Sequence, residues 1–284
     1  MSFLPPDQLP ARVIESKNNP RLKELRRTLA QPGSHPHGLA AVEGPNLVEE
    51  ALRSGLVVRS VFAELETEKF VSRLRLAAST EVLLAPRALL AQALTTESPQ
   101  LIAALLEPPV WSWKDLLQKQ KNPQNHLILV LAGLQDPGNL GTILRSAEAF
   151  GATGIVALTG TVSPWNPKAV RASAGSLFRL PLVASTPEEA FAKLRTAGVR
   201  IWTTALREST PAPAADLAPP TAILIGNEGK GVPAAIAAQA DAALTIPCPG
   251  PVESLNAAIA ASILLYEASR QRTSSTDHQK EAAQ

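Results

Sequence analysis

Five short apolar runs in the C-terminal half constrain the fold of this chain most strongly. Each run is about as long as a strand, and helical segments separate them. Uninterrupted apolar strands are covered on both faces, so the pattern predicts a mostly parallel sheet with helices on both faces. The expected strands are Leu127–Ala132, Gly154–Leu158, Arg200–Thr204, Thr221–Ile225 and Ala242–Ile246. The expected helices lie near Leu140–Phe150, Pro187–Ala197, Pro233–Ala240 and Ser254–Ser269.

The first part of the chain predicts a second, smaller α/β domain over residues 1–107. Asn19-Pro20 opens an expected helix through Ala30, a second ends at Arg53 before Gly55, and short strands are expected at Val57–Ala63 and Glu81–Leu84. Residues 108–124, which begin with two adjacent prolines and contain the polar stretch from Gln118, are expected to form a linker. The domain with the parallel sheet would then cover 125–270, and the polar segment 271–284 is expected to be disordered.

Composition excludes several classes of protein. A length of 284 residues leaves room for two modest domains, and no apolar run is long enough to span a bilayer. The N-terminus lacks a basic segment followed by an apolar one, so we expect no secretory signal and a cytoplasmic location. With one cysteine, Cys248, and four histidines, neither a disulfide nor a metal site is expected.

The net charge of +2 is too small to identify a nucleic-acid partner, but the charge is unevenly distributed. Six basic residues lie between positions 12 and 27, against two acidic ones. This cluster is compatible either with a solvated helix face or with a surface that contacts phosphates. If it contacts RNA, basic residues further along the chain are expected to join it. The candidate RNA-binding residues are Arg12, Lys17, Arg21, Lys23, Arg26, Lys168 and Arg171.

Three polar segments follow expected strands, where open α/β sheets bind ligands. The first runs from Gln135 and contains Asn139 and Arg145. Asn139 is placed to cap the helix that follows, and Arg145 lies nearly two turns further along it. Taken alone, the pattern is compatible with a structural cap and a surface charge.

The second polar segment, Gly-Asn-Glu-Gly-Lys-Gly from Gly226, allows a loop whose backbone approaches a ligand closely. It matches neither a phosphate-binding P-loop nor the dinucleotide fingerprint Gly-x-Gly-x-x-Gly. Glu228 could accept hydrogen bonds from a ribose, pair with a cation such as Arg145, or face water.

The third segment, Ile246-Pro-Cys-Pro-Gly-Pro, leads to Ser254-Leu-Asn256. Prolines and a glycine predict a shaped loop that opens a helix N-terminus, where free N–H groups are available to a ligand. Ser254 is expected to cap this helix with Asn256 in its first turn. Leu255, Ile259 and Ile263 are expected to form its buried face, and Cys248 is expected to be an apolar filler.

Together, Asn139 with Arg145, Glu228 in its glycine loop and Ser254-Leu-Asn256 resemble the three motifs of the SpoU/TrmH family. The segment from Asn166 to Pro181 is similar to a family segment, and Val42-Glu-Gly-Pro-Asn resembles the substrate-binding domain that many members carry at the N-terminus. These are S-adenosylmethionine-dependent RNA ribose 2′-O-methyltransferases of the SPOUT class. The resemblance implies a C-terminal trefoil knot and a homodimer with the site near the subunit interface.

The resemblance also implies the site residues. The catalytic set would be Arg145, Asn139, Glu228, Ser254 and Asn256. Since arginine stays protonated in proteins, we expect Arg145 to orient the hydroxyl and stabilise negative charge rather than act as a base. S-adenosylmethionine would contact Leu224, Gly226, Asn227, Glu228, Gly229, Gly231, Ile246, Pro247, Pro249, Ser254, Leu255 and Asn256.

Two alternatives remain open at this stage. One is a non-catalytic RNA-binding or ribosome-assembly protein of the same fold, against which the intact motif residues argue. The other is a Rossmann-like enzyme for a small metabolite, which lacks its phosphate-binding fingerprint here. Ribosomal RNA is the expected substrate, and transfer RNA is the alternative.

Overall fold

The computed structural model describes residues 11–33, 35, 37–95, 101–117, 126–205, 208–252 and 254–281. The chain divides into two compact units. The first contains residues 1–110 together with 163–179, and the second contains 111–162 and 180–284. The chain therefore passes between the units three times. The segment 118–125, which contains the C-terminal part of the predicted linker, lies outside the described residues.

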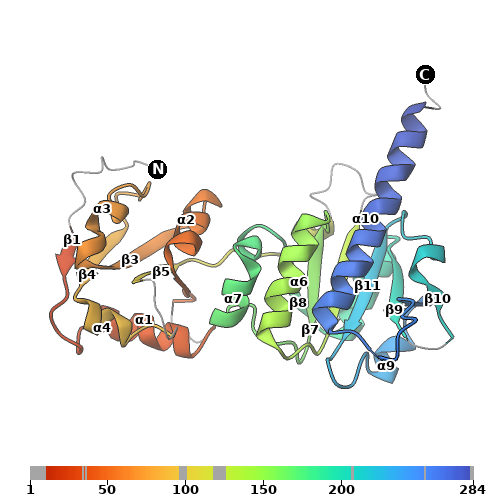
Figure 1. The fold of residues 1–284 in the computed structure, drawn as a ribbon, viewed down its shortest axis with the longest axis horizontal. Helices are drawn as coiled ribbons and strands as arrows, with labels where there is room; N and C mark the ends of the chain where they lie inside the picture. Colours follow the sequence, from red (N-terminus) through yellow and green to blue (C-terminus); the bar gives the residue numbers. More distant parts are fainter. Residues whose placement is uncertain are drawn as a thin grey trace. The chain divides into compact units, whose positions relative to one another are not determined.

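The first unit is built on a five-stranded sheet in the order β1-β4-β3-β5-β2 (Figure 1). β4 is parallel to β1 and β3, whereas β5 runs antiparallel to β3 and β2. The predicted strands near residues 57 and 81 are present as β3 and β4, and β1, β2 and β5 were not predicted. The strands are β1 (Ala11–Val13), β2 (Ala40–Glu43), β3 (Val58–Glu64), β4 (Glu81–Ala85) and β5 (Ile102–Leu106).

Short helices connect these strands, and α1 spans the predicted residues. Asn19 caps it by accepting a hydrogen bond from the Arg21 amide, and Pro20 occupies its first turn. Leu22, Leu25 and Leu29 are buried against the sheet. The helices of this unit are α1 (Pro20–Ala30), α2 (Pro45–Arg53), α3 (Glu68–Val71), α4 (Arg87–Ala91) and α7 (Pro167–Ser173), with 3-10 turns at Leu65–Thr67 and Ser176–Phe178.

The second unit is built on a seven-stranded parallel sheet in the order β10-β12-β9-β11-β6-β7-β8. Five of its strands match the five predicted runs, which confirms the α/β fold class and the parallel sheet. β8 and the two-residue β10 were not predicted. The strands are β6 (Leu127–Ala132), β7 (Gly154–Leu158), β8 (Leu182–Ser185), β9 (Arg200–Thr204), β10 (Thr210–Pro211), β11 (Thr221–Gly226) and β12 (Ala242–Thr245).

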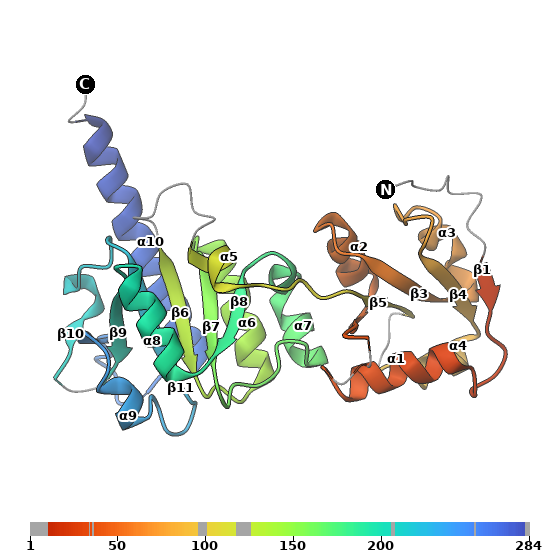
Figure 2. The same ribbon diagram turned by 180° about the vertical axis from the view of Figure 1, so that it is seen from behind.

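Helices cover both faces of this sheet. α6 and α10 lie on one face, and α5 and α8 lie on the other (Figures 1 and 2). The second face holds a core in which Leu116, Phe191 and Leu194 pack on strand residues such as Val130. The helices are α5 (Trp113–Leu117), α6 (Pro137–Ala149), α8 (Pro187–Thr196), α9 (Ala234–Ala237) and α10 (Ala257–Glu281), with a 3-10 turn at Ala212–Ala214.

The last helix differs from its prediction in its buried face. Ile259 is 51% exposed and Ile263 is 38% exposed. The buried side chains are small or lie at other positions, because α10 packs closely against α6. They are Ala257, Ala258, Ala261, Leu264, Leu265 and Ala268.

The predicted disordered tail is helical over most of its length, since α10 continues to Glu281. Gln271 anchors this extension by accepting a hydrogen bond from the Leu217 amide at 2.9 Å and donating one to the Ala215 carbonyl at 3.1 Å. Residues 282–284 lie outside the described part of the chain. Among the described residues, no helix is long and apolar enough to cross a membrane.

Candidate active site

The three polar segments follow β6, β11 and β12, whose carboxyl ends lie on the same edge of the parallel sheet. Gly226 at the end of β11 is in register with Ala132 at the end of β6. β12 pairs with β9 on the far side of β11. The sheet therefore brings residues that are about a hundred positions apart in sequence to one place, as the sequence predicts.

Asp136, and not Asn139, caps α6. The Asp136 carboxylate accepts a hydrogen bond from the Asn139 amide at 2.8 Å, and Pro137 begins the helix. The prediction that Asn139 caps this helix is therefore wrong. Because the Asp136 carboxylate accepts the hydrogen bond of a free amide in the first turn of α6, the Asn139 side chain is available for contacts with other segments.

Asn139 links the three polar segments. Its Nδ2 donates a hydrogen bond to Oε1 of Glu228 at 3.0 Å. Its Oδ1 accepts a hydrogen bond from Nδ2 of Asn256, also at 3.0 Å. One side-chain amide thus uses both its donor and its acceptor to connect the glycine loop with the start of α10.

Glu228 also accepts two backbone hydrogen bonds, from the amides of Asp136 at 3.1 Å and Gln135 at 3.3 Å. Burial alone would raise the pKa of Glu228, but the hydrogen bonds from Asn139 and from backbone amides hold that pKa below its usual value. Glu228 is therefore ionised at neutral pH, and its hydrogen bonds go to Asn139 rather than to Arg145.

Asn256 caps α10, since its Oδ1 accepts hydrogen bonds from the amides of Ala258 at 2.9 Å and Ile259 at 3.3 Å. The helix begins at Ala257, three residues after the predicted start. Ser254 is exposed and does not cap it, which corrects that expectation. Ser254 instead lies in the loop ahead of the helix, where its hydroxyl faces solvent.

The glycine loop is held tightly at its base. Asn227 and Gly231 exchange backbone hydrogen bonds at 2.9 and 3.0 Å. A Cβ added to Gly226 would lie 2.1 Å from the carbonyl carbon of Gly231, so only glycine fits there. The Asn227 side chain donates to the Gly133 carbonyl at 3.1 Å and accepts from the Gly229 amide at 2.9 Å.

The proline loop leaves its backbone groups available. In the described parts of 247–255, no backbone or side-chain group makes a hydrogen bond within the chain. Three prolines restrict the loop, and Ile246 and Leu255 beside it are half-buried. Free amides and carbonyls with neighbouring apolar side chains suit a flat, polar-edged ring such as adenine. These residues therefore fit S-adenosylmethionine.

Two residues, one predicted cofactor contact and one predicted filler, have surroundings that differ from their predictions. The Leu224 side chain is fully buried in the core, and its carbonyl accepts a hydrogen bond from the Thr204 hydroxyl at 3.0 Å. Leu224 therefore supports the sheet beneath the loops rather than facing them. Cys248, expected as an apolar filler, is exposed.

Arg145 lies on α6, six residues after Asn139, which is about 9 Å further along the axis and about 120° around it. It is exposed, and within the described ranges it has no hydrogen-bond or ion-pair partner. Next to it, Ser146 and Ser262 join α6 to α10 through a hydroxyl–hydroxyl hydrogen bond at 2.7 Å. The guanidinium is therefore available to a bound RNA.

The predicted RNA-binding residues of the first unit fall into two groups near β1 and α1 and a third group on α7. Lys17, Lys23 and Arg26 are exposed on or near α1. Arg12 and Arg21 are exposed but form ion pairs with Glu81. Neither carboxylate partner of Arg21, Glu24 or Glu81, was singled out from the sequence.

The two remaining basic candidates lie on α7. Arg171 pairs with the buried carboxylate of Glu43 at 3.3 Å, and Glu43 also accepts a hydrogen bond from the Thr95 amide at 2.6 Å. Lys168 lies in the first turn of α7 with its amide bonded to the Asn166 cap. Arg171 therefore holds α7 against the sheet of the first unit.

Comparison with known proteins identifies the same class of enzyme. The SpoU rRNA methylase family model matches residues 126–266, about half of the chain. The chain is 33% identical over 253 residues to the 23S rRNA (guanosine(2553)-2′-O)-methyltransferase RlmP of Bacillus subtilis, covering 89% of this chain and 97% of that protein. It is also 33% identical over 274 residues to the 23S rRNA (uridine(2479)-2′-O)-methyltransferase of Streptomyces viridochromogenes, covering 93% and 94%.

Solved structures agree over most of the chain. An AdoMet-bound rRNA methyltransferase from Sinorhizobium meliloti matches with a TM-score of 0.80 at 31% identity, covering 92% of this chain and 98% of that one. The SpoU methyltransferase AviRb from Streptomyces viridochromogenes, in complex with the cofactor AdoMet, matches with a TM-score of 0.80 at 30% identity, covering 90% and 99%.

The fold and site therefore define a SPOUT-class methyltransferase. The chain belongs to the SpoU rRNA methylase family. This confirms the predicted family and the prediction that the protein is an RNA methyltransferase. It also confirms S-adenosylmethionine as the predicted cofactor.

Proposed function

We propose that this protein methylates a ribose 2′-hydroxyl of ribosomal RNA and that Asn139, Glu228, Asn256, Ser254 and Arg145 form its catalytic centre. The observation that carries the proposal is the hydrogen-bonded series Glu228–Asn139–Asn256. It joins the three family motifs through side chains at a sheet edge suited to ligand binding. Relatives that align over most of the chain are named as 23S rRNA 2′-O-methyltransferases, which favours ribosomal over transfer RNA.

S-adenosylmethionine, when bound, supplies an electrophilic methyl group, and the loops 226–231, 246–251 and 254–256 would hold it. The glycine loop and the proline loop present backbone groups to it, and Ile246 and Leu255 present apolar surface. Leu224 acts from beneath, by fixing the strand that carries the glycine loop. The ionised Glu228 places a negative charge at this edge, where it favours a cationic ligand.

Arg145 acts on the RNA. A ribose hydroxyl is a poor nucleophile at neutral pH, so its developing negative charge needs stabilisation. The N–H groups of the Arg145 guanidinium can donate hydrogen bonds to RNA, because no described residue accepts a hydrogen bond from them. The guanidinium also remains charged. We infer that it orients the hydroxyl and stabilises the alkoxide that develops as the hydroxyl proton passes to solvent water, while Asn139 and Asn256 keep α6 and α10 in register around it.

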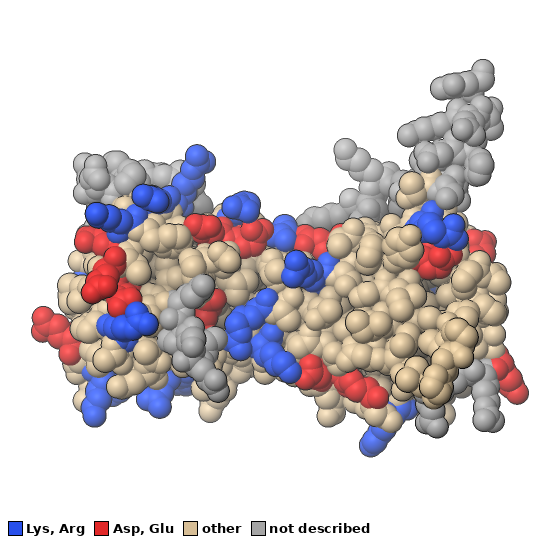
Figure 3. All heavy atoms as spheres, viewed as in Figure 1, with Lys and Arg blue, Asp and Glu red and all other residues tan. Residues whose placement is uncertain are grey.

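The same proposal includes a homodimer that covers part of the α6–α10 face. Ile259, Ile263 and Tyr266 of α10 are exposed by 51%, 38% and 55%, although they are large and apolar. Figure 3 shows that the surface over α6 and α10 carries mostly uncharged side chains. Burial of such a patch stabilises association. A C-terminal trefoil knot and a cytoplasmic location remain predictions of the same family resemblance.

The test is to incubate the purified protein with radiolabelled S-adenosylmethionine and, separately, unmodified ribosomal RNA and transfer RNA. We expect label at a ribose of ribosomal RNA and at least a hundredfold slower labelling by Arg145→Ala, on the scale expected for a lost electrostatic catalyst (roughly 100-fold). Cofactor binding by calorimetry should be unchanged in the variant. Label in transfer RNA alone would overturn the substrate assignment. Binding of S-adenosylmethionine without labelling of either RNA would favour a non-catalytic RNA-binding protein.

A further inference from the structure

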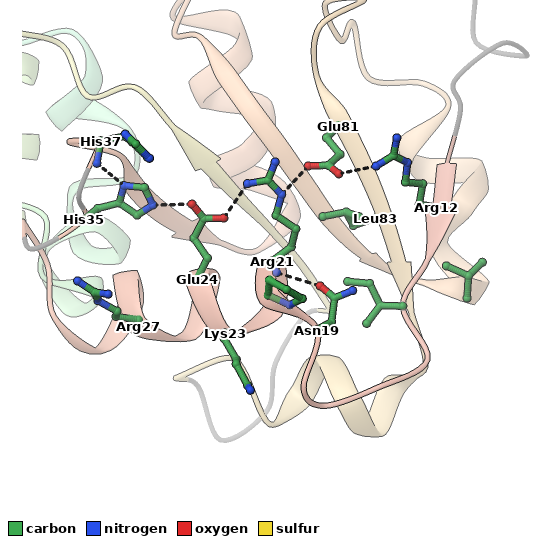
Figure 4. Close-up of a pocket in the computed structure, with 13 residues that line it drawn as sticks. Arg12, Asn19, Arg21, Lys23, Glu24, Arg27, His35, His37, Glu81 and Leu83 are labelled. Carbon is green, nitrogen blue, oxygen red and sulfur yellow. Dashed lines mark hydrogen bonds and ion pairs between the residues drawn. The ribbon is translucent and has the colours of Figure 1, made fainter.

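The first unit contains a cavity of about 770 Å³ between β1, α1 and β4, here called the α1 pocket. Its lining includes Arg12, Val13, Arg21, Lys23, Glu24 and Glu81 (Figure 4). A second cavity of about 440 Å³ adjoins it and shares Arg21, Glu24 and Glu81. Both cavities lie within one unit, far along the sequence from the methyltransferase motifs.

A continuous chain of polar contacts crosses the α1 pocket, and Arg21 is at its centre (Figure 4). Arg21 Nε pairs with Glu81 at 2.9 Å, and Arg21 Nη1 pairs with Glu24 at 3.0 Å. Glu81 also pairs with Arg12 at 3.4 Å, and Glu24 with the buried His35 at 2.8 Å. Two carboxylates thus hold the Arg21 guanidinium from two sides.

These contacts fix the plane of the guanidinium and leave it accessible. The Arg21 side chain remains 50% exposed, and its Nη2 makes no hydrogen bond or ion pair with any described residue. Planar guanidinium groups stack on nucleobases, as aromatic rings do. A side chain that is held at two donors and still half-exposed has lost most of its conformational freedom before a ligand arrives, which lowers the entropic cost of binding.

The pocket also has an excess of positive charge. Burial alone would raise the pKa of Glu24, but hydrogen bonds from Arg21 and His35, together with the charge of Arg21, hold that pKa below its usual value. Two arginines match the two carboxylates, since Arg21 lies between them and Arg12 pairs with Glu81 from its other side. Lys23 and Arg27, one turn apart on α1, line the pocket as exposed cations, and neither has a partner among the described residues.

We propose that the α1 pocket binds one unpaired nucleotide of the RNA substrate, with its base stacked on the Arg21 guanidinium and its phosphate against Lys23 and Arg27. This rests on the proposed function, because it assigns a recognition site on the RNA that the second unit methylates. Glu24 and Glu81 are positioning residues that act through Arg21. Val13 and Pro20 supply apolar surface beside the stacked base.

The nucleotide is unpaired because stacking needs an accessible base face, which a duplex buries. The cavity is lined by side chains of three elements and is partly open to solvent, so a single base can enter it from the surface. Simple attraction between an RNA duplex and a basic surface would use the exposed cations and would not require a fixed guanidinium plane. The two kinds of binding therefore respond differently to substitutions that keep the charge.

The first test compares Arg21→Lys with Arg73→Lys in the full-length protein. Arg73 is an exposed arginine of the same unit that does not line either cavity. Binding of a short labelled single-stranded RNA is measured by fluorescence anisotropy, with the same strand paired to its complement as competitor. We expect Arg21→Lys to weaken single-strand binding about tenfold, the scale of one lost stacking contact. Arg73→Lys should leave it within about twofold of the unmodified protein.

The second test uses Glu81→Ala. Base stacking on Arg21 and long-range charge attraction predict opposite changes in the RNA affinity of this variant. Removal of a negative charge beside a cationic surface should tighten RNA binding if long-range attraction governs it. We expect weaker binding, because Arg21 loses the carboxylate that orients its plane. Thermal unfolding confirms that each variant is folded. Tighter binding by Glu81→Ala, or equal binding by Arg21→Lys and the unmodified protein, would overturn the inference.

Methyl transfer separates this inference from the proposed function. If the pocket is correctly assigned, Arg21→Lys raises the KM for ribosomal RNA about tenfold and leaves S-adenosylmethionine binding unchanged. A protein that methylates RNA with the same KM after this substitution has the proposed function but not the proposed pocket. A protein that binds single-stranded RNA through Arg21 but labels neither RNA has the pocket but not the function.

Discussion

The Asn139 amide donates a hydrogen bond to the Glu228 carboxylate at 3.0 Å, although the two residues are 89 positions apart in sequence. The two residues follow neighbouring parallel strands, β6 and β11, so the sheet register determines their separation. Asn139 simultaneously accepts from Asn256 at 3.0 Å. Any substitution at Asn139 therefore disturbs both loops that are expected to hold the cofactor.

We predict that Asn139→Asp is more damaging than Asn139→Ala at neutral pH. Alanine removes one hydrogen bond from Glu228, whereas aspartate faces the ionised Glu228 with a second negative charge. Methyl transfer should fall roughly 100-fold in Asn139→Ala, as expected when a reacting group is misplaced. It should fall further in Asn139→Asp.

The pH dependence of Asn139→Asp provides the control. As the pH falls, one of the two facing carboxyls takes up a proton and can donate the hydrogen bond that the amide donated. The activity of Asn139→Asp relative to the unmodified protein should therefore rise at lower pH, while that of Asn139→Ala should not. Parallel profiles for the two variants would argue against a direct contact between position 139 and Glu228.

Arg145→Lys distinguishes charge stabilisation from a specific base. Lysine keeps the positive charge but loses the planar set of donors. If Arg145 acts electrostatically, Arg145→Lys should retain more activity than Arg145→Ala, with a similar pH–rate profile to that of the unmodified protein. A new acidic limb in the profile of Arg145→Lys, measured as kcat against pH, would instead indicate that residue 145 accepts the proton.

Gly226→Ala should prevent cofactor binding. An added Cβ would lie 2.1 Å from the carbonyl carbon of Gly231, so the loop would have to open. Gly198, in the turn before β9 and outside the cofactor loops, provides the control, because nothing lies within 4 Å of a Cβ there and only its positive φ strains an alanine. Calorimetry with S-adenosylmethionine should show at least tenfold weaker binding by Gly226→Ala, with about normal binding by Gly198→Ala. Similar affinities for both variants would contradict the proposed loop geometry.

Glu228 should stabilise the fold above its pKa and lose that effect in acid. Its pKa in the folded state lies below its ordinary value, so the folded protein binds its proton more weakly than the unfolded chain. Its contribution is complete above the unfolded pKa of about 4.3 and disappears as the pH falls through the folded value. The melting temperatures of Glu228→Gln and the unmodified protein should therefore converge between about pH 6 and pH 3.

Glu66→Gln is the control for Glu228→Gln, since Glu66 is an exposed carboxylate that makes no hydrogen bond with any described residue. Its melting temperature should follow that of the unmodified protein at every pH. The melting temperature of Glu66→Gln could instead differ from that of the unmodified protein at neutral pH and converge with it in acid to the same extent. The effect would then reflect net charge rather than the contacts of Glu228.

The sheet of the second unit was predictable because its signals are local. The runs at 127–132 and 154–158 are buried on both sides of the strand and the run at 200–204 is buried at its centre, and all three match the observed strands residue for residue. β8 was missed because its four residues directly follow Pro181 and include a polar serine. Short strands at a sheet edge carry too little periodicity to be identified from sequence.

Side-chain partners were much harder to predict. The sequence identified Asn139, Glu228 and Asn256 as site residues but did not determine which of them touch. Those contacts depend on register between distant strands. The buried face of α10 was predicted wrongly because Ile259 and Ile263 are apolar, whereas close packing on α6 selects small residues such as Ala261.

Arg272 provides the last prediction, because it holds the part of α10 beyond the predicted end of the domain. Its guanidinium donates to the carbonyls of Leu217 at 3.1 Å, His126 at 3.0 Å and Pro219 at 2.6 Å. Burial lowers the pKa of Arg272 to about 10, so it remains charged at neutral pH. Charge-assisted bonds to carbonyls that lie just before β6 and β11 should fix the helix to the sheet.

Arg272→Leu should therefore lower the free energy of unfolding by at least about 2 kcal/mol in urea denaturation, because three carbonyls lose a charged donor. Arg270→Leu is the matched control two residues away, since Arg270 is an exposed partner of Glu267 on the same helix. It should change the urea midpoint little, because exposed ion pairs stabilise a fold weakly. Equal midpoints for the two variants would show that the end of α10 contributes nothing to the stability of the second unit.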